Sequence, residues 1–414
     1  TVVEVQLESQ PLRMEPMVVW AQRGGEDGHT AAYVETIPIE TLQAPGADLA
    51  QALDVATNVN VRRYGGLGSF STLSIRGSTS EQVQVYLDGV LLNQALGGGV
   101  NLGNLPLAGV ESVQIYRGAT PARFGGNSLG GVVHIRTTSL SRSKKSYVRV
   151  AAGSFGTHHL DASAAGPLGR WQYLTLANLS TSENDFRFWD DNGTQYNPDD
   201  DDWARRSNSD FHSFRLLTKL GRRLGEKRVQ IHNTFDLSHS GISGIGVHQA
   251  RHTRLDSWRK LTEANLHGAL VRGFGGYAVR AYHSLTTSEY KDLKNEIGVG
   301  TQHDRNTTTS VGLRGEINGI LPNRGLLTLF GSGQYENLEP GNLLQPDKSI
   351  HSRRYRSALG GEIESLPLLR RLTFTAGIQI ERLDNRLLTH QEVVTSALER
   401  GRHDTETVWG FRFG

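Results

Sequence analysis

Cysteine is absent from the 414 residues, which excludes a disulfide scaffold and any metal site built on thiolates. No apolar run approaches the ~20 residues that a membrane-spanning helix needs. Neither sign of charge dominates, with 44 Lys and Arg against 42 Asp and Glu, so the charge balance gives no reason to expect nucleic acid as a partner.

Hydrophobic residues are also scarce, at 37%, whereas glycine is abundant, with 48 residues. A chain of half-apolar strands joined by polar loops has this composition, as outer-membrane barrels do, and a set of helical membrane spans does not. The length allows roughly two or three domains.

The first part of the chain predicts a strand and linker followed by a mixed domain. From Thr1 to about Ala21, apolar residues recur with period two and are interrupted by Pro11 and Pro16. From about residue 34 to 138 the chain combines a helical stretch with short strands, enough for an α+β domain with its own core. The expected elements are a helix over Ala47–Ala56 and strands over Thr72–Arg76, Val83–Leu87, Val110–Arg117 and Gly131–Thr137.

After Ser143 the pattern becomes a succession of strands. Twelve are predicted: Lys144–Gly153, His158–Gly166, Arg170–Ser182, Asp210–Gly221, Glu226–Ser238, Ser257–Gly268, Phe274–Thr287, Thr307–Gly319, Gly325–Glu336, Arg353–Glu364, Arg370–Arg382 and Thr405–Gly414.

Several of these strands alternate between an apolar and a polar face. In one of them Phe214, Leu216 and Leu220 oppose Arg215 and Lys219. Charged side chains on an inner face need water, so the pattern favours a polar lumen over the dry core of a sandwich.

The connections between the predicted strands alternate between short and long. Gly166–Arg170 and Leu321–Asn323 are tight, whereas long polar loops occupy about 183–209 and 288–306. Short turns at one end and long loops at the other are typical of an outer-membrane barrel. The alternative is a soluble β-sandwich or propeller, in which connection lengths are rarely sorted in this way.

Over roughly Pro16 to Thr138 the sequence resembles the TonB-dependent receptor family. Leu49–Ser69 is similar to the family's helix leading into a poorly ordered glycine segment, and Leu73–Asn93 carries its I-R-G and a D-G turn at Asp88-Gly89. Such a turn needs φ > 0 at both central residues. Leu105–Thr138 carries the family's R-G, F-G-G and G-G-V-V-x-I-x-T ending.

The resemblance implies an α+β plug domain followed by an antiparallel transmembrane β-barrel. The implied division is the end of an upstream β-domain or linker over 1–16, the plug with its TonB box over 17–142, and the first part of the barrel over 143–414. Twelve strands would close into a cylinder of backbone radius about 12 Å. A plug of about 125 residues equals a sphere of radius about 18 Å, so we expect about 22 strands in the whole barrel.

The function implied by the resemblance is active transport across the cell outer membrane, gated by ligand and energised by a TonB-type complex in the periplasm. The expected solute is scarce and large, such as an iron-siderophore or cobalamin, and the barrel would face outer-membrane lipid. Alternatives are a glycan or peptide uptake receptor and a signal-transducing receptor. The sequence has no P-loop, H-E-x-x-H or nucleophile elbow, so we expect no enzyme and no required cofactor.

A segment near the N-terminus is similar to the family's TonB box. It is extended, apolar and flanked by proline, which suits strand addition to a partner's sheet edge. Trp20 departs from the small polar residue usual there, and the alternative is a plain linker. The expected coupling residues are Glu15, Met17, Val18, Val19, Trp20 and Ala21.

The resemblance also implies a lock between plug and barrel, because the corresponding arginines of the family pair with barrel carboxylates. Here Arg76 and Arg117 each precede a glycine at a strand end. The alternative is that both are solvated strand-end charges. The carboxylates expected to receive them face inward: Glu316, Glu362, Glu364 and Glu381.

The loop after the third predicted barrel strand is rich in aromatic and acidic residues. Phe188, Trp189, Tyr196 and Trp203 are candidate contacts for ligand or lipid headgroups. The carboxylates supply the oxygen ligands that Ca²⁺ takes, as in some cobalamin importers of the family, and the alternative is a solvated acidic loop. The calcium candidates are Asp190, Asp199, Asp200, Asp201 and Asp202.

Overall fold

The computed structural model describes most of the chain. The described residues are 33–39, 48–93, 99–118, 120–121, 124, 130–194, 196–245, 248–270, 275–321, 325–346, 350–365, 374–389 and 403–413. The expected strand and linker before residue 22 lie outside them.

The plug domain, here the described residues from Tyr33 to Thr138, is built on a five-stranded sheet of order β1-β6-β7-β4-β5. Its pairings are antiparallel except for β4 with β7. All four strands predicted in this domain are present. The bounds are β1 Tyr33–Pro38, β2 Val59–Arg63, β3 Ser71–Ile75, β4 Val83–Leu87, β5 Val90–Leu91, β6 Val110–Arg117 and β7 Gly131–Thr137.

In the described part of this domain, one short α-helix packs beside β2 and β3. α1 runs over Leu49–Asp54, shorter than predicted, and begins at Asp48, whose carboxylate accepts a hydrogen bond from the Gln51 N–H at 2.7 Å. Its fully buried Leu49 and Leu53 belong to the main apolar core of the domain. The residues after the helix form β2, which pairs with β3 as a hairpin.

The rest of the chain forms one large antiparallel sheet. In the described part it has twelve strands, each paired with its neighbours in the sequence, and β8 and β23 are its edges. All twelve predicted barrel strands are confirmed. Their bounds are β8 Lys145–Gly153, β9 Thr157–Leu168, β10 Trp171–Ser182, β13 Phe211–Leu224, β14 Lys227–Gly241, β17 Arg254–Ala269, β18 Gly275–Asp292, β19 Gln302–Ile320, β20 Leu326–Asn342, β21 Ile350–Glu364, β22 Thr375–Thr389 and β23 His403–Phe413.

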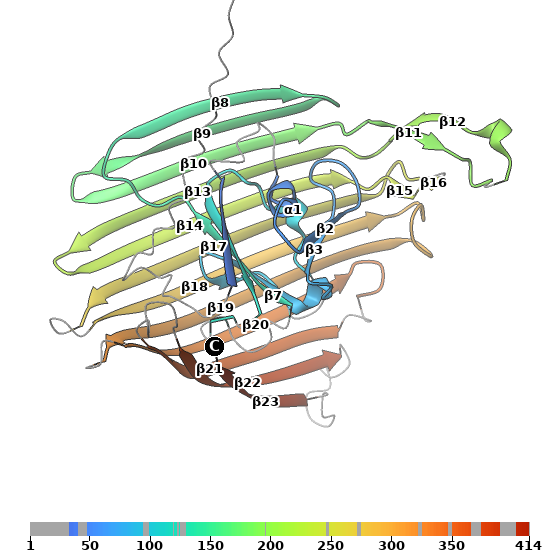
Figure 1. Cartoon of the computed structure of the whole chain (residues 1–414). Helices are drawn as coiled ribbons and strands as arrows, with labels where there is room; N and C mark the ends of the chain where they lie inside the picture. Colours follow the sequence, from blue (N-terminus) through green and yellow to red (C-terminus); the bar gives the residue numbers. More distant parts are fainter. Residues whose placement is uncertain are drawn as a thin grey trace, which may run out of the picture.

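The plug domain lies against one face of this sheet (Figure 1). Figure 1 also shows two small hairpins that extend from the long loops, β11 (Arg187–Asp190) with β12 (Asp202–Arg205) and β15 (Gly244–Ile245) with β16 (His248–Gln249). We call the opposite end of the sheet, where β13 turns into β14 through residues 225–226, the short-turn end.

The strand register sorts the side chains of the sheet into an outer apolar face and an inner polar face. One outer row of direct cross-strand neighbours is Val150, Leu160, Leu179, Phe214, Leu237 and Trp258. Next to it, an inner row is Arg149, Asp161, Asn178, Arg215, Asp236 and Arg259. The inner row alternates in charge, which stabilises neighbouring strands.

Among the described helices, none combines the length and apolar character needed to cross a membrane.

Candidate functional site

Polar groups attach the plug domain to the inner face of the sheet, and Arg215 is the most deeply buried of them. Apolar contacts lie beside them, because Leu261 of β17 belongs to the main plug core and Leu217 of β13 packs with Ala108 and Leu140. Its side chain is 2% exposed and its Nη1 donates to the plug carbonyls of Pro106 at 2.9 Å and Ala108 at 3.4 Å. Its Nε donates to Asp236 at 2.6 Å. The inner-face charges were predicted to need water, but Arg215 binds the plug backbone and a neighbouring strand instead.

A second contact is made by the tip of the β4–β5 hairpin. Asp88 and Gly89 have φ of +47° and +87°, as the D-G motif predicts. Asp88 accepts hydrogen bonds from the N–H of Thr137, at 2.8 Å, and from its hydroxyl. On the sheet side, Lys219 Nζ lies 3.4 Å from the Asp88 carboxylate and His232 Nδ1 lies 4.0 Å from it.

The charge of Asp88 is therefore stabilised from both domains. Burial acts to raise the pKa of Asp88, but Lys219 and the two hydrogen bonds from Thr137 outweigh it and hold the pKa well below its usual range. A charged Asp88 at neutral pH pairs with the buried ammonium of Lys219, and the pair joins the plug domain to the sheet.

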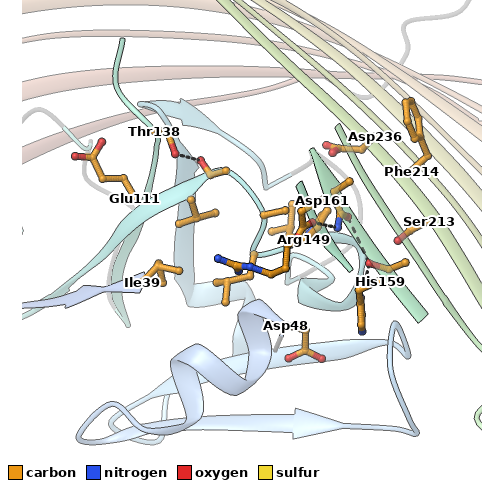
Figure 2. A pocket seen from close by; sticks show the side chains of 18 of the residues that line it. Ile39, Asp48, Glu111, Thr138, Arg149, His159, Asp161, Ser213, Phe214 and Asp236 are labelled. Atoms are coloured by element: carbon orange, nitrogen blue, oxygen red, sulfur yellow. Dashed lines mark hydrogen bonds between the residues drawn. The ribbon is translucent and has the colours of Figure 1, made fainter. Parts of the chain in front are cut away.

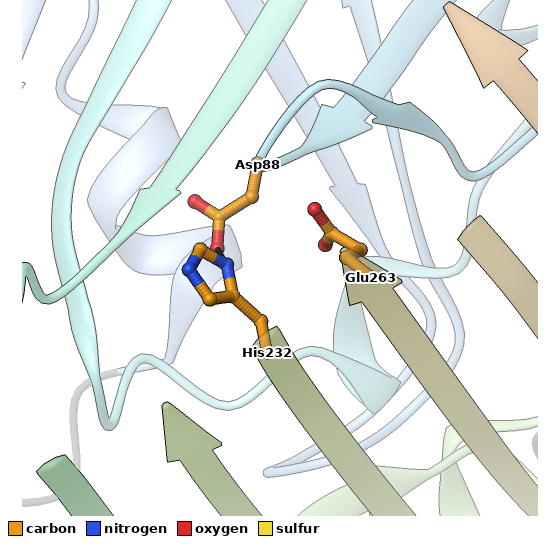
Figure 3. A group of neighbouring side chains, drawn as sticks. All are labelled: Asp88, His232 and Glu263. Atoms are coloured by element: carbon orange, nitrogen blue, oxygen red, sulfur yellow. Dashed lines mark ion pairs between the residues drawn. The ribbon is translucent and has the colours of Figure 1, made fainter. Parts of the chain in front are cut away.

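Asp88, His232 and Glu263 also form the group of potential metal ligands that the described residues contain (Figure 3). Their ligand atoms lie within 4.8 Å of one another, and the three side chains converge from the hairpin, β14 and β17. However, the ammonium of Lys219 already lies 3.4 Å from Asp88 Oδ2. Because that cation occupies the place of a metal ion, we assign the cluster to the contact between plug and sheet.

Two further contacts lie toward the long loops. The Asn184 side chain donates to the Leu67 carbonyl at 2.9 Å and accepts from the Leu67 N–H at 3.1 Å. Asn104 of the plug domain donates to the Ser257 hydroxyl of β17 at 3.0 Å. These are neutral hydrogen bonds, which separate at lower cost than buried ion pairs.

A cavity of about 520 Å³ lies between the plug domain and the first strands of the sheet (Figure 2). Its sheet side carries Arg149, His159 and Asp161, and its plug side includes Asp48 and Glu111. Asp161 accepts a hydrogen bond from Asn178 at 2.6 Å, and His159 Nδ1 is 2.9 Å from the Ser180 hydroxyl. The lining thus combines charged and polar groups with apolar side chains such as Leu107 and Phe211, and it follows the line along which the plug domain meets the sheet.

The structure places the predicted lock residues as follows. Arg117 makes an ion pair with Glu35 of β1, inside the plug domain, and Arg76 is exposed at a strand end. Glu316 lies 3.7 Å from Arg314, and Glu381 lies 3.2 Å from Arg356, in each case within the sheet. A pairing of the two arginines with Glu316, Glu362 or Glu364 stays a prediction. The contacts of Asp88 and Arg215 with the opposite domain were not predicted.

The predicted coupling residues, Glu15 and 17–21, lie outside the described residues.

The aromatic loop residues are partly brought together. Trp189 and Trp203 are cross-strand partners in the β11–β12 hairpin, with ring centroids 5.5 Å apart and edge-to-face geometry. Phe188 lies under the guanidinium of Arg206, whereas Tyr196 is 93% exposed. The exposed Trp189 and Trp203 therefore form an aromatic surface on this loop.

The predicted calcium ligands engage protein groups in the same loop. Asp200 accepts from the Thr194 hydroxyl at 2.7 Å, Asp201 from the Trp189 indole at 3.2 Å, and Asp202 from the Trp203 N–H at 2.6 Å. Calcium binding by this loop stays a prediction.

Glu296 ties two other long loops together. It accepts hydrogen bonds from the N–H groups of Arg251, His252 and Thr253 at 3.0, 2.7 and 3.1 Å. Burial acts to raise the pKa of Glu296, but the bonds from His252 and its neighbours outweigh it and lower the pKa to about 2. The loops after β16 and β18 are thus held together at neutral pH.

Comparison with known proteins agrees with this geometry. Residues 28–132 match the TonB-dependent Receptor Plug Domain family. The vitamin B12 transporter BtuB of Vibrio cholerae is 29% identical over 181 residues, 43% of this chain and 29% of that protein. BtuB of Photobacterium profundum is 32% identical over 114 residues, 27% of this chain and 19% of that protein.

Solved structures show the same fold over nearly the whole chain. The FrpB iron transporter from Neisseria meningitidis superposes with a TM-score of 0.73 at 14% identity, covering 92% of this chain and 61% of that one. The copper transporter OprC superposes with a TM-score of 0.69 at 12% identity, covering 92% of this chain and 60% of that one. The matches span less than a third of these curated relatives and about three fifths of the solved structures.

The fold is that of a plug domain held on the inner face of a barrel-type antiparallel sheet. Residues 28–132 form a TonB-dependent receptor plug domain, and the relatives and solved structures support the same receptor family for the chain.

Proposed function

We propose that the protein is an outer-membrane transporter, ligand-gated and TonB-energised, for a scarce large solute such as an iron-siderophore or cobalamin. The observation that carries the proposal is the attachment of the plug domain to the sheet through buried polar contacts, beside a cavity of about 520 Å³ whose lining includes charged side chains. A polar contact exchanges its hydrogen bonds with water when it opens, which lowers the cost of shifting the plug domain against the sheet.

The outer face of the sheet supports a position in the membrane. Its apolar side chains, such as Val150, Leu160 and Leu237, are each more than two fifths exposed and follow one another across neighbouring strands. A continuous apolar band of this kind is stable against lipid and unfavourable in water. On this proposal residues 143–414 belong to the barrel and residues 17–142 to the plug with its coupling segment.

The names of the relatives support the choice of solute class, since they are transporters of vitamin B12 and of iron. In the proposed mechanism, ligand contacts the long loops, including the Trp189–Trp203 surface, and the apex of the plug domain. The contact shifts the plug domain, and a periplasmic TonB-type partner that binds residues 17–21 then pulls it.

A deletion strain tests the function. Removal of the coding locus should lower uptake of labelled cyanocobalamin or of one ferric chelate and should slow growth when that solute is limiting. Uptake should return when the intact gene is supplied. Unchanged uptake of every iron chelate and cobalamin tested would contradict the assignment to this solute class.

A further inference from the structure

A second cavity, of about 560 Å³, lies between the plug domain and the sheet at the short-turn end. It is lined by strands β10, β13, β14, β17 and β18 and by the segment that leaves β7. We call it the short-turn chamber. Among the described residues that line it, seven are Arg or Lys and two are carboxylates: Arg136, Arg142, Lys219, Arg223, Lys227, Arg228 and Arg280 against Asp88 and Glu226.

The two carboxylates offset only a small part of the positive charge in the chamber. Asp88 lies at the inner end of the chamber and is already paired with Lys219 at 3.4 Å. Glu226 lies in the two-residue turn between β13 and β14 and is exposed. In the described part of the chain, no ion pair involves Arg142, Arg223, Lys227 or Arg228.

The strand register places positive charges directly opposite each other at this end of the sheet. Arg223 of β13 lies directly opposite Arg228 of β14, and Arg228 lies directly opposite His267 of β17. Like charges directly opposite each other destabilise an antiparallel pair. Four rows of inward side chains further along the same strands, Arg215, Asp236 and Arg259 alternate in sign and are paired at 2.6 and 2.7 Å.

Alternation along the strand also sets the face to which the Arg223 and Arg222 side chains point. Inward residues of β13 alternate through Arg215, Lys219 and Arg223, because side chains of a strand point to one face at every second residue. The Arg223 Nε donates to the Gly225 carbonyl at 3.1 Å, which holds its guanidinium near the turn. The adjacent Arg222 belongs to the other face, where its guanidinium lies 5.6 Å from the centre of the Trp171 ring.

We propose that the short-turn chamber binds a multiply charged oxyanion, with phosphate or carboxylate groups, between Arg223 and Arg228. Guanidinium groups bind such oxygens through two parallel hydrogen bonds, and an anion between two arginines removes their mutual repulsion. Arg142, from the segment after β7, faces the same space from the plug side. The site goes beyond the proposed function, since it requires neither an energy source nor a particular cargo.

The test is calorimetric titration of the purified full-length protein in detergent with inorganic pyrophosphate and with citrate. We expect binding that weakens with added salt and falls about tenfold in Arg223→Gln and in Arg228→Gln, since each loses charge-assisted hydrogen bonds. The matched control is Arg222→Gln, which removes the same charge one residue away on the opposite face. Nanodiscs with and without phosphatidylglycerol distinguish a lipid headgroup from a free anion as the source of the phosphate.

A thermal measurement keeps the test independent of folding defects. Without ligand, the double variant Arg223→Gln/Arg228→Gln should melt at or above the wild-type temperature, because a repulsion is removed. With pyrophosphate, the melting temperature should rise in the wild type and in Arg222→Gln but not in the double variant. Equal loss of binding in Arg222→Gln, or no binding of either anion and no dependence on phosphatidylglycerol by folded protein, would overturn the proposal. Neither result would bear on uptake, which the deletion strain tests separately.

Discussion

Replacing Val18 or Val19 by proline should abolish energised uptake while ligand binding at the cell surface stays at the wild-type level. A partner that adds this segment to its sheet edge needs the backbone N–H of each paired residue, and proline has none. Ligand binding does not depend on that pairing, because the proposed ligand surfaces lie on the long loops and the plug apex. The measurement is uptake and surface binding of the same labelled solute, in energised cells.

Two variants control for the loss of a side chain and for proline itself. Val18→Ile keeps the N–H and should transport normally. Val3→Pro places proline upstream of the expected coupling segment and should also transport normally. Wild-type uptake by Val18→Pro and Val19→Pro together would show that the segment is a linker.

The substitution Asp88→Asn should lower the free energy of unfolding by about 3 kcal/mol, the cost of leaving one member of a buried pair without its partner. The Lys219 side chain is 5% exposed and would lose the carboxylate that lies 3.4 Å from its ammonium. Asparagine tolerates the positive φ of this turn, so the change isolates the charge. The measurement is urea unfolding in detergent, with protease digestion of the plug domain as a second readout.

The double variant Asp88→Asn/Lys219→Met should recover much of the loss, because it removes both charges. Asp54→Asn, on an exposed residue at the end of α1, is the matched control and should be neutral. If Asp88→Asn were as stable as Asp54→Asn, the hairpin tip would not hold the plug domain to the sheet.

The same pair sets an expected pH dependence. Because the folded protein lowers the pKa of Asp88 from its ordinary 3.8, the pair contributes its full stability above the unfolded pKa and loses it as the pH falls through the folded pKa. The difference between wild type and Asp88→Asn should therefore stay constant from neutral pH down to about pH 5 and shrink only in stronger acid.

The strands could be predicted because the outer face of the sheet is apolar and the short turns are marked by glycine and proline. The positions where these strands end near the long loops could not be predicted. β18 continues to Asp292 and β20 to Asn342, five and six residues beyond the predicted Thr287 and Glu336. Beyond the apolar band both faces of a strand are polar, so period two disappears from the sequence while the backbone hydrogen bonds continue.

For the contacts between plug and sheet, the sequence identified some of the residues but not their pairing. Asp88 was recognised from the backbone requirement of a D-G turn, and Lys219 as an inward charge. Their pairing joins residues more than a hundred positions apart and depends on how the plug domain is seated, for which a single sequence carries no periodic signal. Arg117 likewise pairs with Glu35 on β1, a strand that was not predicted and that contains Glu35 and Pro38, residue types depleted in strands.

The central claim is that transport requires the plug domain to move against the sheet, and a reversible bridge between the two tests it most directly. Asn104 and Ser257, whose side chains are 3.0 Å apart, can be replaced by cysteine in a chain that contains none and joined by a short disulfide-forming bis-thiosulfonate. The matched control is Ser238→Cys/Ser257→Cys, whose hydroxyls are 2.7 Å apart and which ties two strands of the sheet to each other. The bridged plug variant should bind ligand, fail to transport it, and transport again after reduction, while the control transports throughout. Wild-type uptake by the fully bridged Asn104→Cys/Ser257→Cys protein would contradict the account.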